Sequence, residues 1–274
     1  MSARPRARAA FLLTLPLAGA ALLLPASLAR VVVDGAQSLA PLPPEAWRVL
    51  AQTVSTSLVL ALVATALALA PAVTLARLVF AHADRPAARV LHRLLAATAA
   101  LPSIVIALAA LAAFAPVLSR MIASPYHLAL AALGLALLAC PVLAIGLLGA
   151  AESGRARAEP AAAALGLSLA GRAFALYLRC ARDWTAAAAL WTVLRLVGET
   201  MVVLLLSGNR PAWPLLPQKA VLAATADIAL NAGEAPPALW APLLLEALAL
   251  IAIACGLSLA VRRLRRGGRK GVAP

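Results

Sequence analysis

Two ionisable residues, Arg195 and Glu199, lie inside a long apolar stretch at residues 184–207 of this 274-residue chain. Arg195 is near the middle of the stretch, roughly 18 Å from either end of a helix, too far to reach a membrane surface. An arginine at that depth costs about 2.5–3.5 kcal/mol on insertion scales, and charges inside membranes generally serve a function. A guanidinium binds oxyanions through paired hydrogen bonds. These residues therefore predict a route for an anion.

The polar groups near this arginine have two interpretations. A continuous helix would place Thr192, Arg195 and Glu199 on one face, and Gly198 would let a neighbouring helix approach closely. A further charge, Glu246, lies as deep in its own apolar stretch as Glu199 does, so the two carboxylates are expected to flank one cavity. The structural interpretation is an ion pair that joins two helices. The functional one is a substrate pathway made by all four ionisable or hydroxyl side chains, with a carboxylate holding the guanidinium until an anion arrives.

The elements that must position these residues are predicted to be membrane helices. The chain is 64% hydrophobic and only 12% charged, about half the charged fraction of a soluble domain. A bilayer requires about 20 apolar residues per helix. Six stretches qualify, and they predict an all-α, polytopic membrane protein with six transmembrane helices: 9–33, 53–76, 94–118, 128–150, 184–207 and 238–261. The first is longer than the core of a cleaved signal peptide, which predicts an uncleaved signal-anchor.

The distribution of basic residues predicts the orientation. With the amino terminus inside, 18 of the 24 Lys and Arg residues fall in inner segments and five in outer ones. Such a bias places both termini in the cytoplasm. The net charge of +14 would suggest nucleic acid in a soluble protein, but here it lies between apolar stretches. We therefore expect membrane lipid, and no nucleic acid, as its counterpart.

The longest predicted cytoplasmic connection is residues 151–183. Its middle reads Glu-Pro-Ala-Ala-Ala-Ala-Leu-Gly over 159–166, where small residues and a glycine allow a helix to end sharply. Phe174, Tyr177 and Leu178 follow as an apolar stripe at helical spacing. An exposed stripe predicts either a partner groove or the membrane surface, and both interpretations stay open.

This connection resembles the coupling segment of importer-type ATP-binding-cassette (ABC) permeases, whose pattern is Glu-Ala-Ala, three residues and Gly. Ala161, Ala162 and Gly166 match it, whereas Pro160 stands where the family has its acidic residue and Glu159 is displaced by one. The resemblance implies that this segment enters a cleft on a cassette ATPase subunit. The sequence contains no Gly-x-x-x-x-Gly-Lys-Ser/Thr loop, so the nucleotide site is expected on that partner.

Residues 195–209 sharpen the resemblance, because Arg-Leu-Val-Gly-Glu-Thr-Met is similar to a segment of phosphate-specific transport permeases. Residues 101–108 and 225–234 also look like stretches of that family, and the likeness covers roughly 50–262. It implies a type I ABC importer permease fold, with Arg195 and Glu199 acting in phosphate passage. It also implies a bacterial inner-membrane location and three kinds of partner: cassette ATPases, a second permease and a periplasmic substrate-binding protein.

The predicted organisation has three parts: residues 1–49 with the first helix and outer loop, the permease domain at 50–262, and a basic tail at 263–274. We expect a non-catalytic subunit without a cofactor or a metal site. Cys140, Cys180 and Cys255 match no zinc or redox spacing, and the three histidines, His127 among them, lie at the edges of apolar stretches as interfacial histidines do.

Three alternatives remain open. The same architecture serves other tetrahedral oxyanions, such as molybdate, tungstate or sulfate. A secondary transporter would use Glu199 and Glu246, but such carriers usually contain internal repeats, and none is evident. A membrane scaffold would leave Arg195 without a purpose. The proline-rich loop at 208–237 is expected either to receive the binding protein or to cap the bundle.

Overall fold

The computed structural model describes residues 43–166, 172–233 and 237–270. Across these ranges every regular element is a helix and no strand forms, so the predicted all-α class is confirmed. The predicted first membrane helix, at 9–33, lies outside the described residues, as does the end of the basic tail.

Three long helices form the frame: α2 (Pro44–Ala81), α5 (Leu128–Ala164) and α10 (Pro237–Lys270). Each contains a stretch long and apolar enough to cross a membrane, and together they cover three of the predicted stretches, 53–76, 128–150 and 238–261. Their outer faces carry exposed apolar side chains, for example Leu62 and Leu67 on α2. Lipid is a suitable environment for such faces, because it does not require a polar surface.

The predicted helix at 94–118 is two helices. α3 (Pro86–Ala99) and α4 (Ser103–Leu118) meet at an angle of 104°. Pro102 has no backbone N–H and disfavours helical geometry in the residue before it, so the chain turns here. If this bent pair makes one crossing, the described residues contain four candidate spans; six remains a prediction.

The predicted helix at 184–207 is also interrupted. α7 (Arg182–Val197) ends before Gly198, and the short α8 (Met201–Leu206) begins three residues later. Glycine is a weak helix former, and here it occupies the position that caps α7. Gly198 was expected to permit close helix contact, but a Cβ atom there would meet only the Arg195 carbonyl oxygen, 3.9 Å away.

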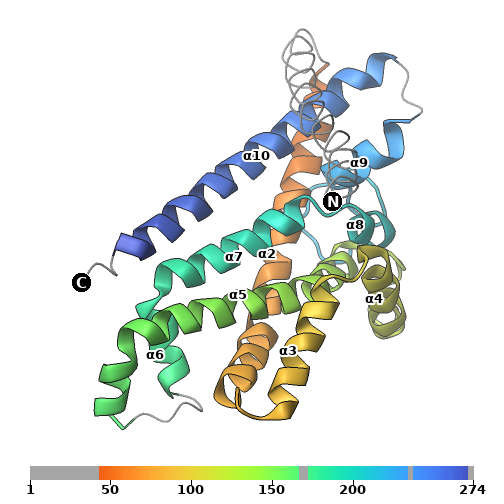
Figure 1. Ribbon diagram of the computed structural model, residues 1–274. Helices are drawn as coiled ribbons and strands as arrows, with labels where there is room; N and C mark the ends of the chain where they lie inside the picture. The colour runs from red at the N-terminus through yellow and green to blue at the C-terminus, as the bar shows by residue number, and fades with distance from the viewer. Residues whose placement is uncertain (1–42, 167–171, 234–236, 271–274) are drawn as a thin grey trace, which may run out of the picture.

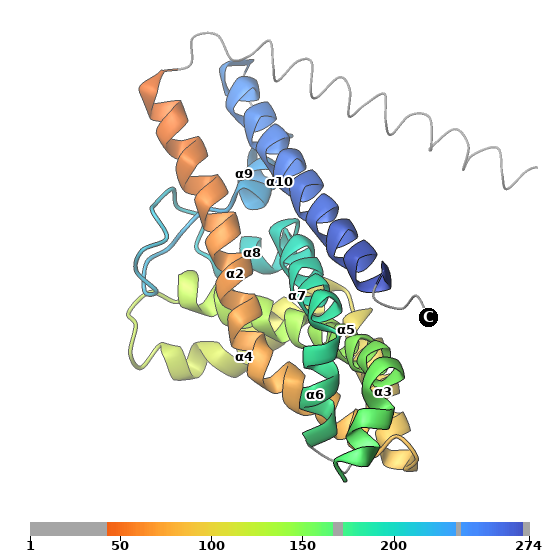
Figure 2. The ribbon, with the colours of Figure 1, turned by 90° about the vertical axis from the view of Figure 1, so that its left-hand side faces the viewer.

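The core lies where α2 packs against α5, with α7 and α8 alongside. Small buried residues at helical spacing on α2 let the helices approach closely: Ala61, Ala64, Ala68, Ala72 and Ala76. Figures 1 and 2 show two ends of the molecule. The starts of α2 and α10 lie with α9 (Ala224–Asn231) at one end, the α9 end, and α6 (Arg172–Cys180) lies with the end of α5 at the other, the α6 end.

The apolar stripe of the 151–183 segment packs within the molecule. Phe174 and Tyr177 of α6 are each 2% exposed, and both rings contact Phe80 at the end of α2, with centroids 5.5 and 5.8 Å apart. Gly154 of α5 lies directly against the Tyr177 backbone. The sequence predicted that this stripe contacts either a partner groove or the membrane surface. For these two rings that prediction is wrong, because they are buried within the chain itself.

His127 has a structural role that its sequence position did not reveal. It was predicted as an interfacial histidine, but it is 1% exposed and caps α5: its Nδ1 accepts a hydrogen bond from the Leu130 N–H at 3.2 Å. Burial lowers the pKa of this imidazole, while a hydrogen bond with the Pro217 backbone acts in the opposite direction. The folded protein therefore favours the neutral ring, which keeps Nδ1 free to accept.

This cap predicts a pH-dependent stability. Because the folded state lowers the pKa of His127 below its ordinary 6.5, its stabilising effect is complete above that pH and is lost as the pH falls through the folded-state pKa. We expect the unfolding temperature in detergent to fall between pH 7.5 and 5 more steeply for the wild type than for His127→Asn, whose amide oxygen keeps an acceptor. Parallel pH profiles for the two proteins would contradict the assignment.

Candidate functional site

Arg195 lies where two helix breaks meet. It is in the last turn of α7, its side chain is exposed, and its guanidinium Nη2 donates to the carbonyl of Ala99, the last residue of α3, at 3.4 Å. The final carbonyls of a helix lack partners within the helix and carry partial negative charge, so a cation is favoured there. At this length the bond is weak. The guanidinium is therefore positioned but remains available to a further anion.

Glu199 lies in the break between α7 and α8. Its N–H donates to the Leu196 carbonyl at 3.1 Å, and its carbonyl accepts from the Thr225 hydroxyl of α9 at 2.9 Å. Arg195 and Glu199 are four residues apart in the sequence, but α7 ends at Val197 between them. Their side chains therefore do not share the face of one continuous helix. Among the described residues no ion pair joins these two side chains. The interpretation of a locked ion pair therefore receives no support.

Thr192 faces the interior. It is 1% exposed, and its hydroxyl donates to the Ala188 carbonyl one turn earlier, at 3.0 Å. The expectation that Thr192 and Arg195 line one polar face is therefore not met, because the first side chain packs inside while the second reaches the surface.

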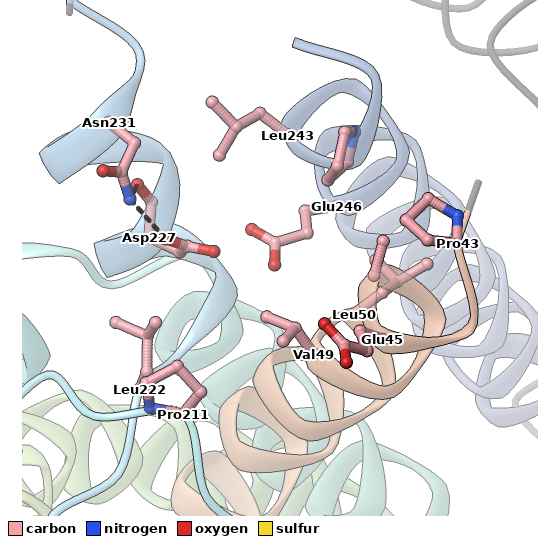
Figure 3. A pocket seen from close by; sticks show the side chains of 12 residues that line it. Pro43, Glu45, Val49, Leu50, Pro211, Leu222, Asp227, Asn231, Leu243 and Glu246 are labelled. Atoms are coloured by element: carbon pink, nitrogen blue, oxygen red, sulfur yellow. Dashed lines mark hydrogen bonds between the residues drawn. The ribbon is translucent and has the colours of Figure 1, made fainter. Parts of the chain in front are cut away.

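Glu246 lies elsewhere, in a cavity of 340 Å³ at the α9 end, between α2, α9 and the start of α10 (Figure 3). It is 1% exposed, and its Oε1 accepts a hydrogen bond from the Thr53 hydroxyl at 2.5 Å. Glu199 is not among the residues that line this cavity. The prediction that Glu199 and Glu246 flank one cavity is therefore not met; the acidic residues that line this cavity with Glu246 are Glu45 and Asp227.

Three of the four residues predicted for coupling, Glu159, Ala161 and Ala162, lie in the last turns of α5. This helix runs through Pro160 to Ala164, and Gly166 follows with φ +63°, a left-handed conformation that glycine adopts without strain. Ala161 is exposed, Leu165 is 69% exposed, and Ala162 is buried. Glu159 pairs with Arg155 one turn earlier, at 2.6 Å between Nε and Oε2, on the surface. The predicted glycine stop is confirmed, but the helix it ends is the extension of a long helix rather than a separate short one.

Sequence reasoning missed the polar residues that hold the α9 end together. Thr53 and Ser57 of α2 are buried; Ser57 Oγ accepts from the Ala224 N–H at the start of α9, at 3.1 Å. Asn231 donates to the Asp227 carboxylate one turn earlier in α9, at 2.6 Å. The available signal was the cluster of hydroxyl and amide residues at 52–57, within the first half of α2.

Within the described ranges no group of three or more His, Cys, Asp or Glu side chains is placed to hold a metal ion. The arrangement therefore offers two polar features in an apolar bundle, an accessible guanidinium beside two helix breaks and an acidic cavity at one end. No protein-family model matches the chain, and no curated protein is significantly similar to it.

Proposed function

We propose that this chain is the transmembrane permease subunit of an ABC importer that carries inorganic phosphate across the bacterial inner membrane, with ATP hydrolysed by a separate subunit. The observation that carries the proposal is Arg195: an exposed guanidinium in the apolar part of the chain, with one long hydrogen bond to a carbonyl at 3.4 Å. It is combined with the likeness of residues 195–209 to phosphate-specific permeases.

The exposure of Arg195 favours a pathway between two permeases. A guanidinium that faced lipid at mid-membrane would cost about 2.5–3.5 kcal/mol. A second permease that covers the surface carrying Arg195 would remove the contact with lipid. The guanidinium would then lie beside the interface between the two permeases. A phosphate ion passing along that interface would meet a guanidinium whose paired N–H groups can donate to two phosphate oxygens.

The α6 end supports the second half of the proposal, docking of the ATPase. The tip of α5 presents Ala161 and Leu165 to solvent, and α6 braces it through the buried Phe174 and Tyr177. A partner that binds this apolar end of α5 could displace the helix, because α6 holds the end of α5 in place. The movement would reach the centre of the molecule, where α5 packs against α2. At the α9 end, Trp213 and Leu215 are 45% and 80% exposed and offer a surface to a periplasmic binding protein.

Uptake of radiolabelled phosphate tests the proposal. A strain lacking this chain should lose most uptake, and a plasmid copy should restore it. An excess of sulfate or molybdate should leave the restored uptake unchanged. Inhibition by either competitor at concentrations equal to that of phosphate would indicate another oxyanion, and normal uptake in the deletion strain would contradict the proposal.

Gly166→Val tests the coupling segment. At φ +63° a β-branched residue costs about 1–2 kcal/mol, so the tip of α5 should change its conformation. We expect phosphate uptake to fall several-fold while ATP hydrolysis by the assembled complex continues. Gly166→Asn is the matched control, because asparagine tolerates this conformation better, and it should retain coupling. Normal coupling in the valine variant would refute the assignment.

A carrier that uses Glu199 and Glu246 as one coupled pair is a weaker candidate, because Glu199 does not line the cavity that contains Glu246.

A further inference from the structure

The acidic cavity at the α9 end has the construction of a small-molecule site. Its volume of 340 Å³ falls within the range of such sites, about 300–1,000 Å³. Most of its wall is apolar and comes from α2, the 207–223 loop and α10: Val49, Leu50, Pro211, Leu222, Pro242 and Leu243. Apolar walls with a few polar groups are typical of ligand sites.

The polar groups of the cavity are strongly biased in charge. Glu45, Asp227 and Glu246 all line it, whereas none of the lining residues is a lysine, arginine or histidine. The bias is unexpected in a chain with 24 basic and 10 acidic residues. Within this wall no basic side chain offsets the negative potential.

Glu246 supplies an observation independent of the charge bias. Its Oε1 accepts from Thr53, but its Oε2 is buried and has no hydrogen-bond partner among the described residues. Figure 3 shows this carboxylate directed into the cavity, with Asp227 facing it from α9. The carboxyl groups of Glu246 and Asp227 lie within hydrogen-bond reach of each other, and a buried acceptor without a donor is costly, so the geometry points to a donor that bridges the two groups.

The class of donor follows from the lining. Hard divalent metals take six or more oxygen ligands, and among the described residues no group of three or more His, Cys, Asp or Glu side chains is placed to hold a metal ion. A primary ammonium offers three hydrogen-bond donors and no acceptor, which matches two facing carboxylates. We propose that this cavity binds a small organic cation through its primary ammonium group, which donates to Glu246 Oε2 and to the Asp227 carboxylate. The carbon chain of the ligand contacts Leu50, Leu222 and Leu243.

Two sources carry this chemistry, a free alkylamine and the ethanolamine headgroup of a phospholipid. The negatively charged phosphate of a headgroup would lie close to the three carboxylates and would be repelled by them. The charges of the cavity therefore favour the free amine. The inference does not depend on phosphate transport, because it concerns a different part of the molecule from Arg195.

The probe for the test is n-butylamine, which is protonated at pH 7.5. With the full-length protein in phosphatidylcholine nanodiscs, we expect saturable binding by calorimetry and a matching rise in unfolding temperature. The neutral analogue 1-butanol should show neither effect. Glu246→Gln and Asp227→Asn should each weaken butylammonium binding at least about tenfold, since each removes a charged acceptor. Glu152→Gln, an exposed acidic residue of α5 at the other end of the molecule, should bind as the wild type does.

Phosphatidylethanolamine in the nanodiscs distinguishes the two sources: competition with butylammonium indicates the headgroup, and no competition indicates the free amine. Four binding results would overturn the proposal. These are binding of butanol with equal affinity, unchanged binding in both Glu246→Gln and Asp227→Asn, full competition by equimolar sodium, and no saturable binding at all. An infrared carbonyl band that shows a protonated Glu246 in the presence of butylammonium, absent from Glu246→Gln, would also overturn it.

Discussion

Arg195→Ala is expected to lower phosphate uptake at least about tenfold while the complex still assembles. The variant removes charged hydrogen-bond donors worth about 1.5–3 kcal/mol to a passing anion, and each 1.4 kcal/mol corresponds to a factor of ten. Folding should be little affected, because the side chain is exposed and its hydrogen bond to Ala99, at 3.4 Å, is the one it makes to the described residues. Initial uptake rates, normalised to the amount of purified complex, measure the effect.

The control variants separate charge from position. Arg195→Lys keeps the charge but loses the planar fork, so it should retain part of the uptake. Arg120→Ala removes an exposed arginine just beyond α4 and should leave uptake unchanged. If Arg195→Ala transports phosphate as the wild type does, or if Arg120→Ala is equally defective, this arginine is not part of the pathway.

Gly154→Ala is expected to loosen the contact between α5 and α6. A Cβ atom at this position would overlap the Tyr177 carbonyl group and would approach its Cα within 2.9 Å. Backbone atoms cannot move aside as a flexible side chain does, and overpacking in a core costs about 1–3 kcal/mol. We expect a lower unfolding temperature in detergent and faster proteolysis of α6, because Phe174 and Tyr177 would separate from Phe80.

Gly149→Ala is the matched control on the same helix, since a Cβ atom there would meet nothing within 4 Å. Alanine is a better helix former than glycine by about 1 kcal/mol, so this variant should be as stable as the wild type or slightly more stable. Equal unfolding temperatures for Gly154→Ala and the wild type would show that α6 does not pack on α5 as described.

Helix class and the longest helices could be predicted from the sequence, because both depend on the length and composition of continuous apolar stretches. The same reasoning predicted single helices over 94–118 and 184–207, and it erred at Pro102 and Gly198. Both residues lie in stretches that are apolar enough for a membrane helix. Hydropathy reports whether a segment is apolar but not the direction in which the chain runs.

The candidate site could be predicted only in part. Arg195 was identified by its residue type in an apolar stretch, and Gly166 by its position after a run of small residues. Thr53 was missed as the hydrogen-bond partner of Glu246, because the two residues are 193 positions apart in the sequence and meet only when α2 packs against α10. Asp227 was missed as a neighbour of Glu246 in the same cavity, because it belongs to a separate short helix, α9. Helical spacing also grouped Thr192 with Arg195, although one faces the core and the other the surface.

What the sequence by itself determined about this protein is its helical class, its apolar helices and the scarcity of charge within them, since these follow from local composition. The likeness to phosphate permeases is also a property of the sequence, and the function drawn from it stays a proposal. Only the tertiary structure decided that Arg195 reaches the surface beside the end of α3, that Phe174 and Tyr177 pack within the molecule, and that Glu246 lies in a separate acidic cavity. The physical reason is that packing between distant helices, rather than the spacing of residues within one helix, selects which side chains are buried and which meet.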